Sequence, residues 1–258
     1  MLRRAIPIGG CKLGLIVNAD DFGISQEVNK AIALAFSKGM INRTTLMVNM
    51  PYAAEAMEIA KREGFISKVG IHLNLTAGRP LNEELSKDAV MCDEKGQFTA
   101  DFARNMKTRF FLPKATSRRV IEEIRLQLQA YGDLGGSLWH MDSHHHVHTD
   151  PSVWKAVMVG AKTFTVSSVR LGRNMYKGGN PLMHVYKWIL NKSINSFSKK
   201  KSNYFGSMQD YQNWIKGMEK SQIQDFIAKN QVEIMVHPMF NEAGELVDSM
   251  EEFPLVLQ

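Results

Sequence analysis

The 258-residue sequence lacks the features that mark several classes of protein. Its two cysteines, Cys11 and Cys92, give neither a disulfide framework nor a zinc-ligand spacing, so a cytoplasmic location is expected. No apolar run approaches the roughly 18–20 residues of a membrane span, and no membrane partner is expected. With 8 Pro and 19 Gly, the composition excludes a fibrous or low-complexity chain.

The N-terminus also lacks a signal peptide in our interpretation. Only six residues separate Arg4 from Cys11, whereas a signal peptide needs roughly 7–15 apolar residues at that place. We expect residues 1–12 to be a flexible lead-in. Residues 13–258 are expected to form a single domain, with an irregular insertion at about 78–113.

Acidic residues are missing from a long internal segment. Residues 151–209 contain no Asp or Glu but ten basic residues, which leaves 22 basic against all 26 acidic residues elsewhere. A basic block can bind nucleic acid or another acidic surface. The simpler interpretation is a solvated segment that lysines keep soluble, so a nucleic-acid partner is not expected.

What is present is an alternation of strand and helix patterns. Short apolar runs predict buried parallel strands, and helical spacing of apolar residues predicts helices between them. The strands are expected at 13–17, 44–48, 69–75, 138–142, 166–171 and 232–236. Repeated strand-helix steps predict an α/β fold with a mostly parallel sheet, closed as an irregular TIM-like (β/α) barrel. An open doubly wound sheet is the alternative, although no Gly-rich phosphate loop follows the first strand.

Several helix ends can be predicted as well. Ser25 is expected to cap the first helix and Gly39 to end it, while Ser117 and Asp150 are expected to cap two later helices. The other predicted helices run from Pro51 to about Arg62, over 182–195, and over 207–229 with a break near Gly217.

Polar residues gather where the predicted strands end. Seven of the eight histidines lie in such segments, the exception being His184. In parallel α/β folds the active site lies at this edge of the sheet. Asp20 and Asp21 follow the first strand, and two adjacent carboxylates repel each other unless a cation takes one of them. They could instead be acidic residues at a helix N-terminus.

The histidines allow a similar pair of interpretations. His72 or His237 alone would more often be a buried structural histidine, but their shared placement at strand ends favours a site. His140, Asp142 and His144 share one face at strand spacing, which suits a ligand and a carboxylate that orients it. One Asp with two His would form an open metal site that polarises a carbonyl and lowers the pKa of water.

Four strings of residues resemble the YdjC-like carbohydrate deacetylases, a family that includes chitooligosaccharide deacetylase. They are NADDFG at 18–23, GIHLNLT at 70–76, HMDSHHHVH at 140–148 and VHP at 236–238. The resemblance runs in order from about residue 13 to 240. It implies a barrel enzyme that uses a divalent metal to hydrolyse the N-acetyl group of an amino sugar or short oligosaccharide.

By motif position, the resemblance implies a role for each of five residues. Asp21, His72 and His144 match the metal ligands, Asp20 the general base, and His237 a general acid. Magnesium is the usual ion of the family, whereas imidazole ligands suit zinc or another transition metal equally well. A further group is expected to contact substrate or orient the ligands: Asn74, His140, Asp142, Arg170 and Phe205.

The sequence also departs from the family. Members commonly read His-Pro-Gly-Tyr where this chain has His237-Pro238-Met239-Phe240, and they continue with a further helix where this chain ends at Gln258. We therefore expect a different pocket wall and a barrel that is open or completed by a partner. Such barrels often pair through apolar faces, so a homodimer is one expectation. A metal-dependent phosphoesterase and a non-catalytic carbohydrate- or nucleic-acid-binding protein are the alternative functions.

Overall fold

The computed structural model describes residues 14–176, 178 and 180–250. The predicted lead-in at 1–12 and Cys11 lie outside the described residues. Among the described residues, no helix has both the length and the apolarity that a bilayer crossing requires.

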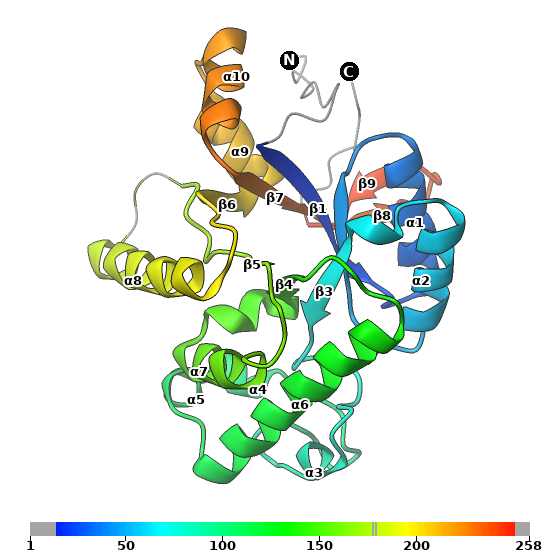
Figure 1. Cartoon of the computed structure of the whole chain (residues 1–258), viewed down its shortest axis with the longest axis vertical. Coiled ribbons are helices and arrows are strands. Elements are labelled where there is room, and N and C mark those ends of the chain that lie inside the picture. The colour runs from blue at the N-terminus through cyan, green and yellow to red at the C-terminus, as the bar shows by residue number, and fades with distance from the viewer. Residues whose placement is uncertain (1–13, 177, 179, 251–258) are drawn as a thin grey trace.

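Seven parallel strands form one curled sheet with helices around it (Figure 1). Along the sheet the order is β5-β4-β3-β2-β1-β7-β6. The α/β class and the parallel barrel-like sheet are therefore confirmed. The strands are β1 (Leu15–Phe22), β2 (Arg43–Leu46), β3 (Val69–Leu73), β4 (His140–Ser143), β5 (Ser168–Val169), β6 (Tyr204–Ser207) and β7 (Val232–Val236).

The chain after β5 bridges the two edges of this sheet. The backbone N–H groups of Asn174 and Met175 donate to the carbonyl of Phe205 in β6, at 3.0 and 3.2 Å. The Phe205 N–H donates in turn to the side chain of Asn174 at 2.8 Å. The barrel is thus completed irregularly, by a loop rather than by a ladder between β5 and β6.

Helices fill the connections between strands, and three short ones lie in the predicted irregular segment 78–113. The helices are α1 (Gln26–Ser37), α2 (Ala53–Arg62), α3 (Glu83–Ser86), α4 (Asp101–Arg104), α5 (Met106–Phe110), α6 (Lys114–Asp133), α7 (Pro151–Gly160), α8 (Pro181–Phe197), α9 (Met208–Ile215) and α10 (Lys220–Lys229). Two 3₁₀ segments, η1 (Ile66–Lys68) and η2 (His144–Thr149), precede β3 and α7.

Some predicted helix ends are confirmed and others are wrong. Ser25 caps α1 by accepting from the Val28 N–H, and Gly39 follows that helix with a φ of 66°. Ser117 is not a cap, because α6 already begins at Lys114. Asp150 occupies the N-cap position of α7 and Pro151 is its first residue, as predicted, but the Asp150 carboxylate binds Arg109 at 2.7 Å instead of a backbone N–H of the helix.

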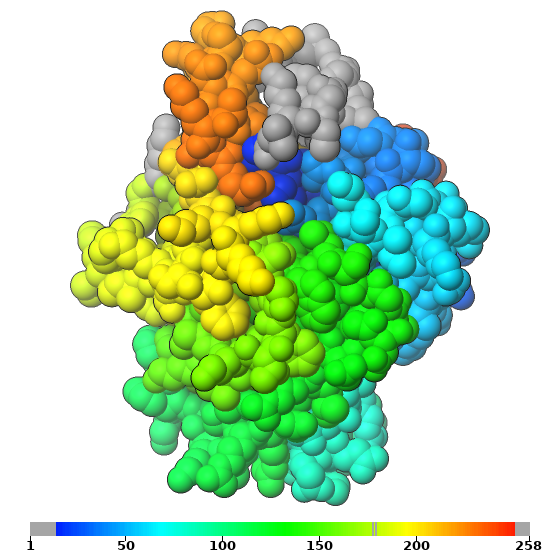
Figure 2. Space-filling model, viewed as in Figure 1, coloured from blue at the N-terminus to red at the C-terminus, as the bar shows by residue number. Residues whose placement is uncertain are grey.

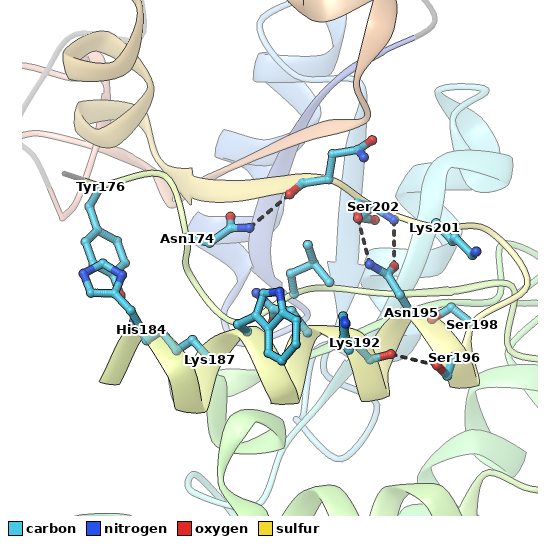
Figure 3. A pocket seen from close by; sticks show the side chains of 14 residues that line it. Asn174, Tyr176, His184, Lys187, Lys192, Asn195, Ser196, Ser198, Lys201 and Ser202 are labelled. Atoms are coloured by element: carbon cyan, nitrogen blue, oxygen red, sulfur yellow. Dashed lines mark hydrogen bonds between the residues drawn. The ribbon is translucent and has the colours of Figure 1, made fainter. Parts of the chain in front are cut away.

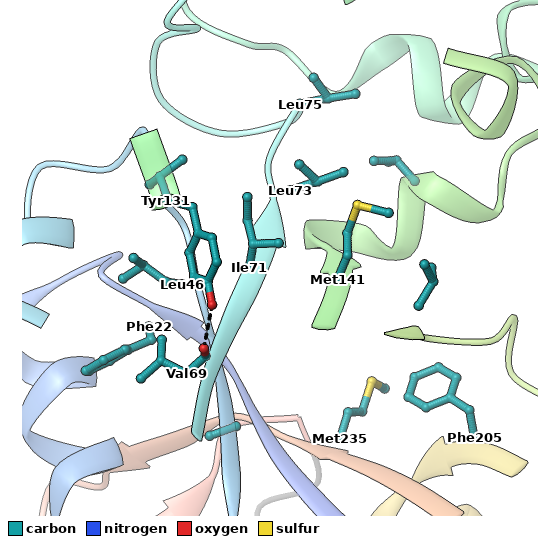
Figure 4. Packing of buried hydrophobic residues seen from close by; sticks show 14 of the residues in the cluster. Phe22, Leu46, Val69, Ile71, Leu73, Leu75, Tyr131, Met141, Phe205 and Met235 are labelled. Carbon is teal, nitrogen blue, oxygen red and sulfur yellow. Dashed lines mark hydrogen bonds between the residues drawn. The ribbon is translucent and has the colours of Figure 1, made fainter. Parts of the chain in front are cut away.

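The apolar core lies between the sheet and the helices that cover it (Figure 4). Ile71 and Leu73 are buried on β3, and the Tyr131 hydroxyl of α6 donates to the Val69 carbonyl at 2.8 Å. Burial of each large apolar side chain contributes roughly 1.5–3 kcal/mol. Close helix packing adds to this at Gly160, where a Cβ would lie 2.9 Å from a backbone oxygen of α6. The core therefore holds the carboxyl ends of the strands in fixed positions.

Candidate functional site

The end of β1 separates two adjacent carboxylates. Pairing with β2 shifts register between Ala19 and Phe22, and Asp21 has a φ of 68°. Such a bulge re-aims the side chains beside it, and Asp tolerates the left-handed conformation better than most residues. Asp20 is consequently buried at 1% exposure, while the side chain of Asp21 keeps 18% exposure.

Asp21 meets two histidines that come from distant parts of the chain. Its Oδ1 atom lies 2.8 Å from His144 Nδ1 and 3.2 Å from His72 Nε2. The possible ligand atoms of the three residues all lie within 4.8 Å of one another, so the cluster could hold a metal ion. The structure thus brings together the three side chains that the family resemblance implied as ligands.

Asp142 orients His72 toward this cluster. Its Oδ1 lies 2.7 Å from His72 Nδ1, which leaves Nε2 directed at Asp21. The other oxygen accepts from the Thr45 hydroxyl at 3.0 Å. Burial alone would lower the pKa of His72, but the carboxylates of Asp142 and Asp21 outweigh it and raise the pKa to about 10. The two carboxylates beside His72 make this place electrostatically suited to a cation.

Arg170 lies behind the cluster as the centre of a buried ion-pair network. Its side chain is fully buried, with the guanidinium 4.8 Å from the ring centroid of Phe205. It binds both oxygens of Asp20 at 2.6 and 2.7 Å, Asp142 at 2.8 Å and Glu233 at 2.6 Å. Burial alone would raise the pKa of Glu233, but Arg170 and then His140 hold it well below its usual range. The basic segment 151–209 was expected to be solvated. Arg170, which belongs to that segment, is instead fully buried.

Arg170 also distinguishes between the groups that could hold a metal. Two further candidate sets exist among the described residues, Asp20 with His72 and Asp142, and His140 with Asp142 and Glu233. Both contain carboxylates that already bind the guanidinium. The set of Asp21 and the two histidines has no such bond to Arg170 and is partly open to solvent. Its mixed carboxylate and imidazole donors fit a divalent cation.

His237 is placed beside Asp20 by a hairpin that the sequence did not reveal. Strands β8 (Pro238–Phe240) and β9 (Leu246–Asp248) pair antiparallel directly after β7. The His237 N–H donates to Asp248 at 3.1 Å, and its carbonyl accepts from the Ser249 N–H at 3.0 Å. These two hydrogen bonds fix the backbone of His237. Its Nε2 atom then lies 3.9 Å from Oδ2 of Asp20, and the His237 side chain is 20% exposed.

The run of histidines after β4 divides into different environments. His145 and His146 have φ values of 52° and 55°, and the His145 ring lies 4.0 Å from that of His144. His148 is fully buried and donates from Nε2 to the Arg170 carbonyl at 3.0 Å. Burial, opposed by the Asp142 charge, lowers the pKa of His148 to about 4. Of this run, only His144 belongs to the candidate metal cluster.

The remaining predicted residues lie around the cluster rather than in it. Asn74 is buried and binds Asn49 and the backbone of the turn at Thr76 and Ala77. His140 lies deeper, 2.9 Å from the Ser168 hydroxyl and 3.6 Å from Glu233. Phe205 packs under the Arg170 guanidinium. Substrate contact by any of these residues stays a prediction.

Sequence reasoning missed three residues that hold the site together. Thr45 and Asn18 link Asp142 to Asp20 through a chain of hydrogen bonds, and Glu233 anchors Arg170. Glu233 had a visible signal, because it is a single charge inside the apolar run of β7. Buried charges of this kind are almost always paired.

Known proteins are similar to this chain along most of its length. The profile of a family described as YdjC-like protein matches residues 14–254. A protein named carbohydrate deacetylase from Vibrio cholerae serotype O1 is 40% identical over 154 residues, and this match covers 59% of the chain but only 56% of that relative. A protein of the same name from Clostridium beijerinckii is 30% identical over 242 residues, which cover 94% of this chain and 88% of the relative.

A solved structure gives the same fold. It is described as a "putative cellobiose-phosphate cleavage protein" from Enterococcus faecalis V583, with a TM-score of 0.62 and 24% identity. The superposition covers 89% of this chain and 82% of that one. At this identity the likeness shows the fold alone. The family profile and the relative that aligns along 94% of the sequence establish that the chain belongs to the family of YdjC-like proteins.

Proposed function

We propose that this chain is a metal-dependent hydrolase that removes the N-acetyl group from an N-acetylated amino sugar or a short oligosaccharide. The observation that carries the proposal is the convergence of Asp21, His72 and His144 next to the buried carboxylate of Asp20. The relatives named carbohydrate deacetylase support the substrate class.

In this proposal Asp21, His72 and His144 hold one divalent cation. Such a cation supplies Lewis acidity, which makes an amide carbonyl more electrophilic and water more acidic. The family resemblance favours magnesium, whereas two imidazole donors favour zinc or another transition ion. Asp142 keeps His72 Nε2 directed at the site, because it binds the opposite ring nitrogen at 2.7 Å.

Asp20 is the proposed general base. Arg170 binds each of its oxygens, and the Asn18 amide donates to Oδ1 at 2.8 Å, so Oδ1 is the more fully occupied of the two. Oδ2 faces His237 and retains the capacity to accept a proton from the attacking water. The bidentate Arg170 contact fixes the direction of this oxygen and removes the need for reorientation during the reaction.

His237 is the proposed general acid. Its Nε2 atom lies 3.9 Å from Asp20 Oδ2 on the partly exposed side of the network. A protonated imidazole at this position can donate to the amine nitrogen as the C–N bond breaks. The β8–β9 hairpin fixes its backbone, so the acid and the base keep a constant separation.

The experiment is an acetate-release assay with N-acetylglucosamine and its short oligomers, on protein reconstituted separately with magnesium and with zinc. Wild type is expected to release acetate in the presence of the right ion. Asp20→Asn is expected to lose turnover at least about a hundredfold while it retains the ion. Full activity of this variant would remove Asp20 as the base.

A panel of phosphate esters serves as the control for substrate class. Release of phosphate without release of acetate would replace the deacetylase proposal by a phosphoesterase. Loss of acetate release in wild type after chelation, and its return with added ion, are expected from the metal site.

A further inference from the structure

The first half of α8 exposes a stripe of large apolar side chains. Leu182, Val185 and Ile189 recur at helical spacing, and their exposed fractions are 79%, 55% and 56%. Trp188, 58% exposed, lies beside them on the side of the helix that lines the groove described below. Leu182, Val185 and Ile189, called here the α8 stripe, belong to a helix at the left margin of the molecule (Figure 2). A contiguous apolar surface of this kind marks an interaction site more often than a free surface.

The apolar surface continues onto α5. The Phe110 ring lies 6.5 Å from that of Tyr186 in α8 and 6.4 Å from that of Phe111. Phe111 is 70% exposed, and the Lys155 ammonium lies 5.7 Å from its ring centroid. Two elements that are far apart in sequence therefore contribute to one apolar surface with a cation at its border.

The other flank of α8 is cationic. Lys187 and Lys192 of the helix and Lys201 of the segment opposite line a groove, and none of its 14 lining residues is acidic (Figure 3). Lys192 Nζ lies 3.7 Å from the centroid of the Trp188 ring. All 14 lining residues belong to the acid-free segment 151–209. The local charge is thus of one sign.

We propose that α8 lies on the surface of an anionic phospholipid bilayer, with the α8 stripe in the headgroup–acyl boundary and the groove lysines on lipid phosphates. A helix with aliphatic residues on one flank, and with Lys and a Trp on the other, is suited to this interface, where a Trp ring lies at the level of the headgroups. Long lysine side chains reach the phosphates while their methylene groups stay on apolar surface. A second copy of the chain suits the patch less well, because it would bring the same positive charge to the contact.

This surface is connected to the candidate site. The Tyr186 hydroxyl donates to the Thr149 carbonyl at 2.5 Å, and Thr149 ends the η2 segment that begins with His144. Binding of α8 would therefore place the bilayer beside the segment that carries His144. The sequence predicted no membrane partner only because no span is present, and surface binding requires none. The proposal does not depend on the proposed deacetylase activity.

The test is sedimentation of the whole chain with vesicles of phosphatidylcholine alone and with vesicles that contain 30 mol% phosphatidylglycerol, at about 0.1 M salt. Binding to the anionic vesicles alone is expected, with a blue shift of tryptophan fluorescence that Trp188→Phe abolishes. The double variant Val185→Ser/Ile189→Ser is expected to bind at least about tenfold more weakly. The triple variant Lys187→Gln/Lys192→Gln/Lys201→Gln should lose about a hundredfold.

Matched controls remove the same chemistry elsewhere on the surface. Two control variants are expected to bind the vesicles as wild type does. One is Met239→Ser, at a residue that is 40% exposed, and the other is Lys30→Gln/Lys38→Gln/Lys61→Gln, at three exposed lysines. Circular dichroism confirms that each variant folds. Equal binding to both kinds of vesicle, or no binding, would overturn the proposal. A third outcome would also overturn it: wild type does not bind the vesicles but forms a dimer in sedimentation velocity, and Val185→Ser/Ile189→Ser abolishes that dimer.

Discussion

Replacement of Arg170 by lysine should destabilise the protein although it preserves the charge. The guanidinium makes four short contacts with three buried carboxylates, two to Asp20 and one each to Asp142 and Glu233. An ammonium group is a single point charge that cannot reproduce this fork. At least two charge-assisted hydrogen bonds would be lost, each worth about 1.5–3 kcal/mol. We therefore expect the free energy of unfolding to fall by about 3–5 kcal/mol, the range found when buried ion pairs are broken.

The assay is urea unfolding followed by far-UV circular dichroism, with Arg119→Lys as the matched control. Arg119 binds Asp88 through a single nitrogen at 2.8 Å, and its side chain is 38% exposed. A lysine can replace that contact, so the control should change the free energy of unfolding by less than about 1 kcal/mol. Equal effects of the two substitutions, or a loss below about 1 kcal/mol for Arg170→Lys, would refute the claim that the ion pairs of Arg170 contribute strongly to the free energy of unfolding.

Two further predictions concern groups around the site. Thr45→Val removes the hydroxyl that donates to Asp142, so Asp142 should hold His72 less firmly. Metal affinity in a calorimetric titration should then fall about tenfold. An unchanged affinity would show that the hydroxyl does not support the site. His148 has a folded-state pKa of about 4, below the usual value near 6.5. Its contribution is complete above pH 6.5 and is lost as the pH falls toward 4, which should cost wild type about 3 kcal/mol of unfolding free energy. His148→Gln should show a correspondingly flatter dependence in urea titrations from pH 7 to 4, and parallel profiles would contradict the buried neutral imidazole.

The sheet was predictable because its strands are buried on both faces. Val232–Val236 stands out as a short run between polar segments, and β7 has these bounds. The first strand was predicted to end at Val17 but continues to Phe22, since the polar residues of NADDF suggested a loop. Polar side chains on buried positions of a strand interrupt the apolar signal at the place where the site forms. The three-residue strands of the β8–β9 hairpin are too short to give a periodicity.

The convergence of the proposed ligand residues was also predictable, whereas the buried residues that hold them in place were not. Parallel strands end at one edge of a sheet, so His72 and the Asp20–Asp21 pair had to approach each other. The position of Arg170 depends on the register of β4 and β5 and on the loop that completes the barrel, neither of which a single sequence specifies. The wider segment 151–209 is rich in basic residues and free of acidic ones, so it was interpreted as solvated although the immediate neighbours of Arg170 are buried.

The most direct test of the account is the metal content of two variants that differ by one position. Asp21→Asn and Asp20→Asn are dialysed with the ion that supports activity, and the bound metal per chain is measured by mass spectrometry beside wild type and His144→Ala. One ion per chain is expected in wild type and in Asp20→Asn, and almost none in Asp21→Asn and His144→Ala. Retention of the ion by Asp21→Asn together with its loss from Asp20→Asn would contradict the assignment of the two carboxylates.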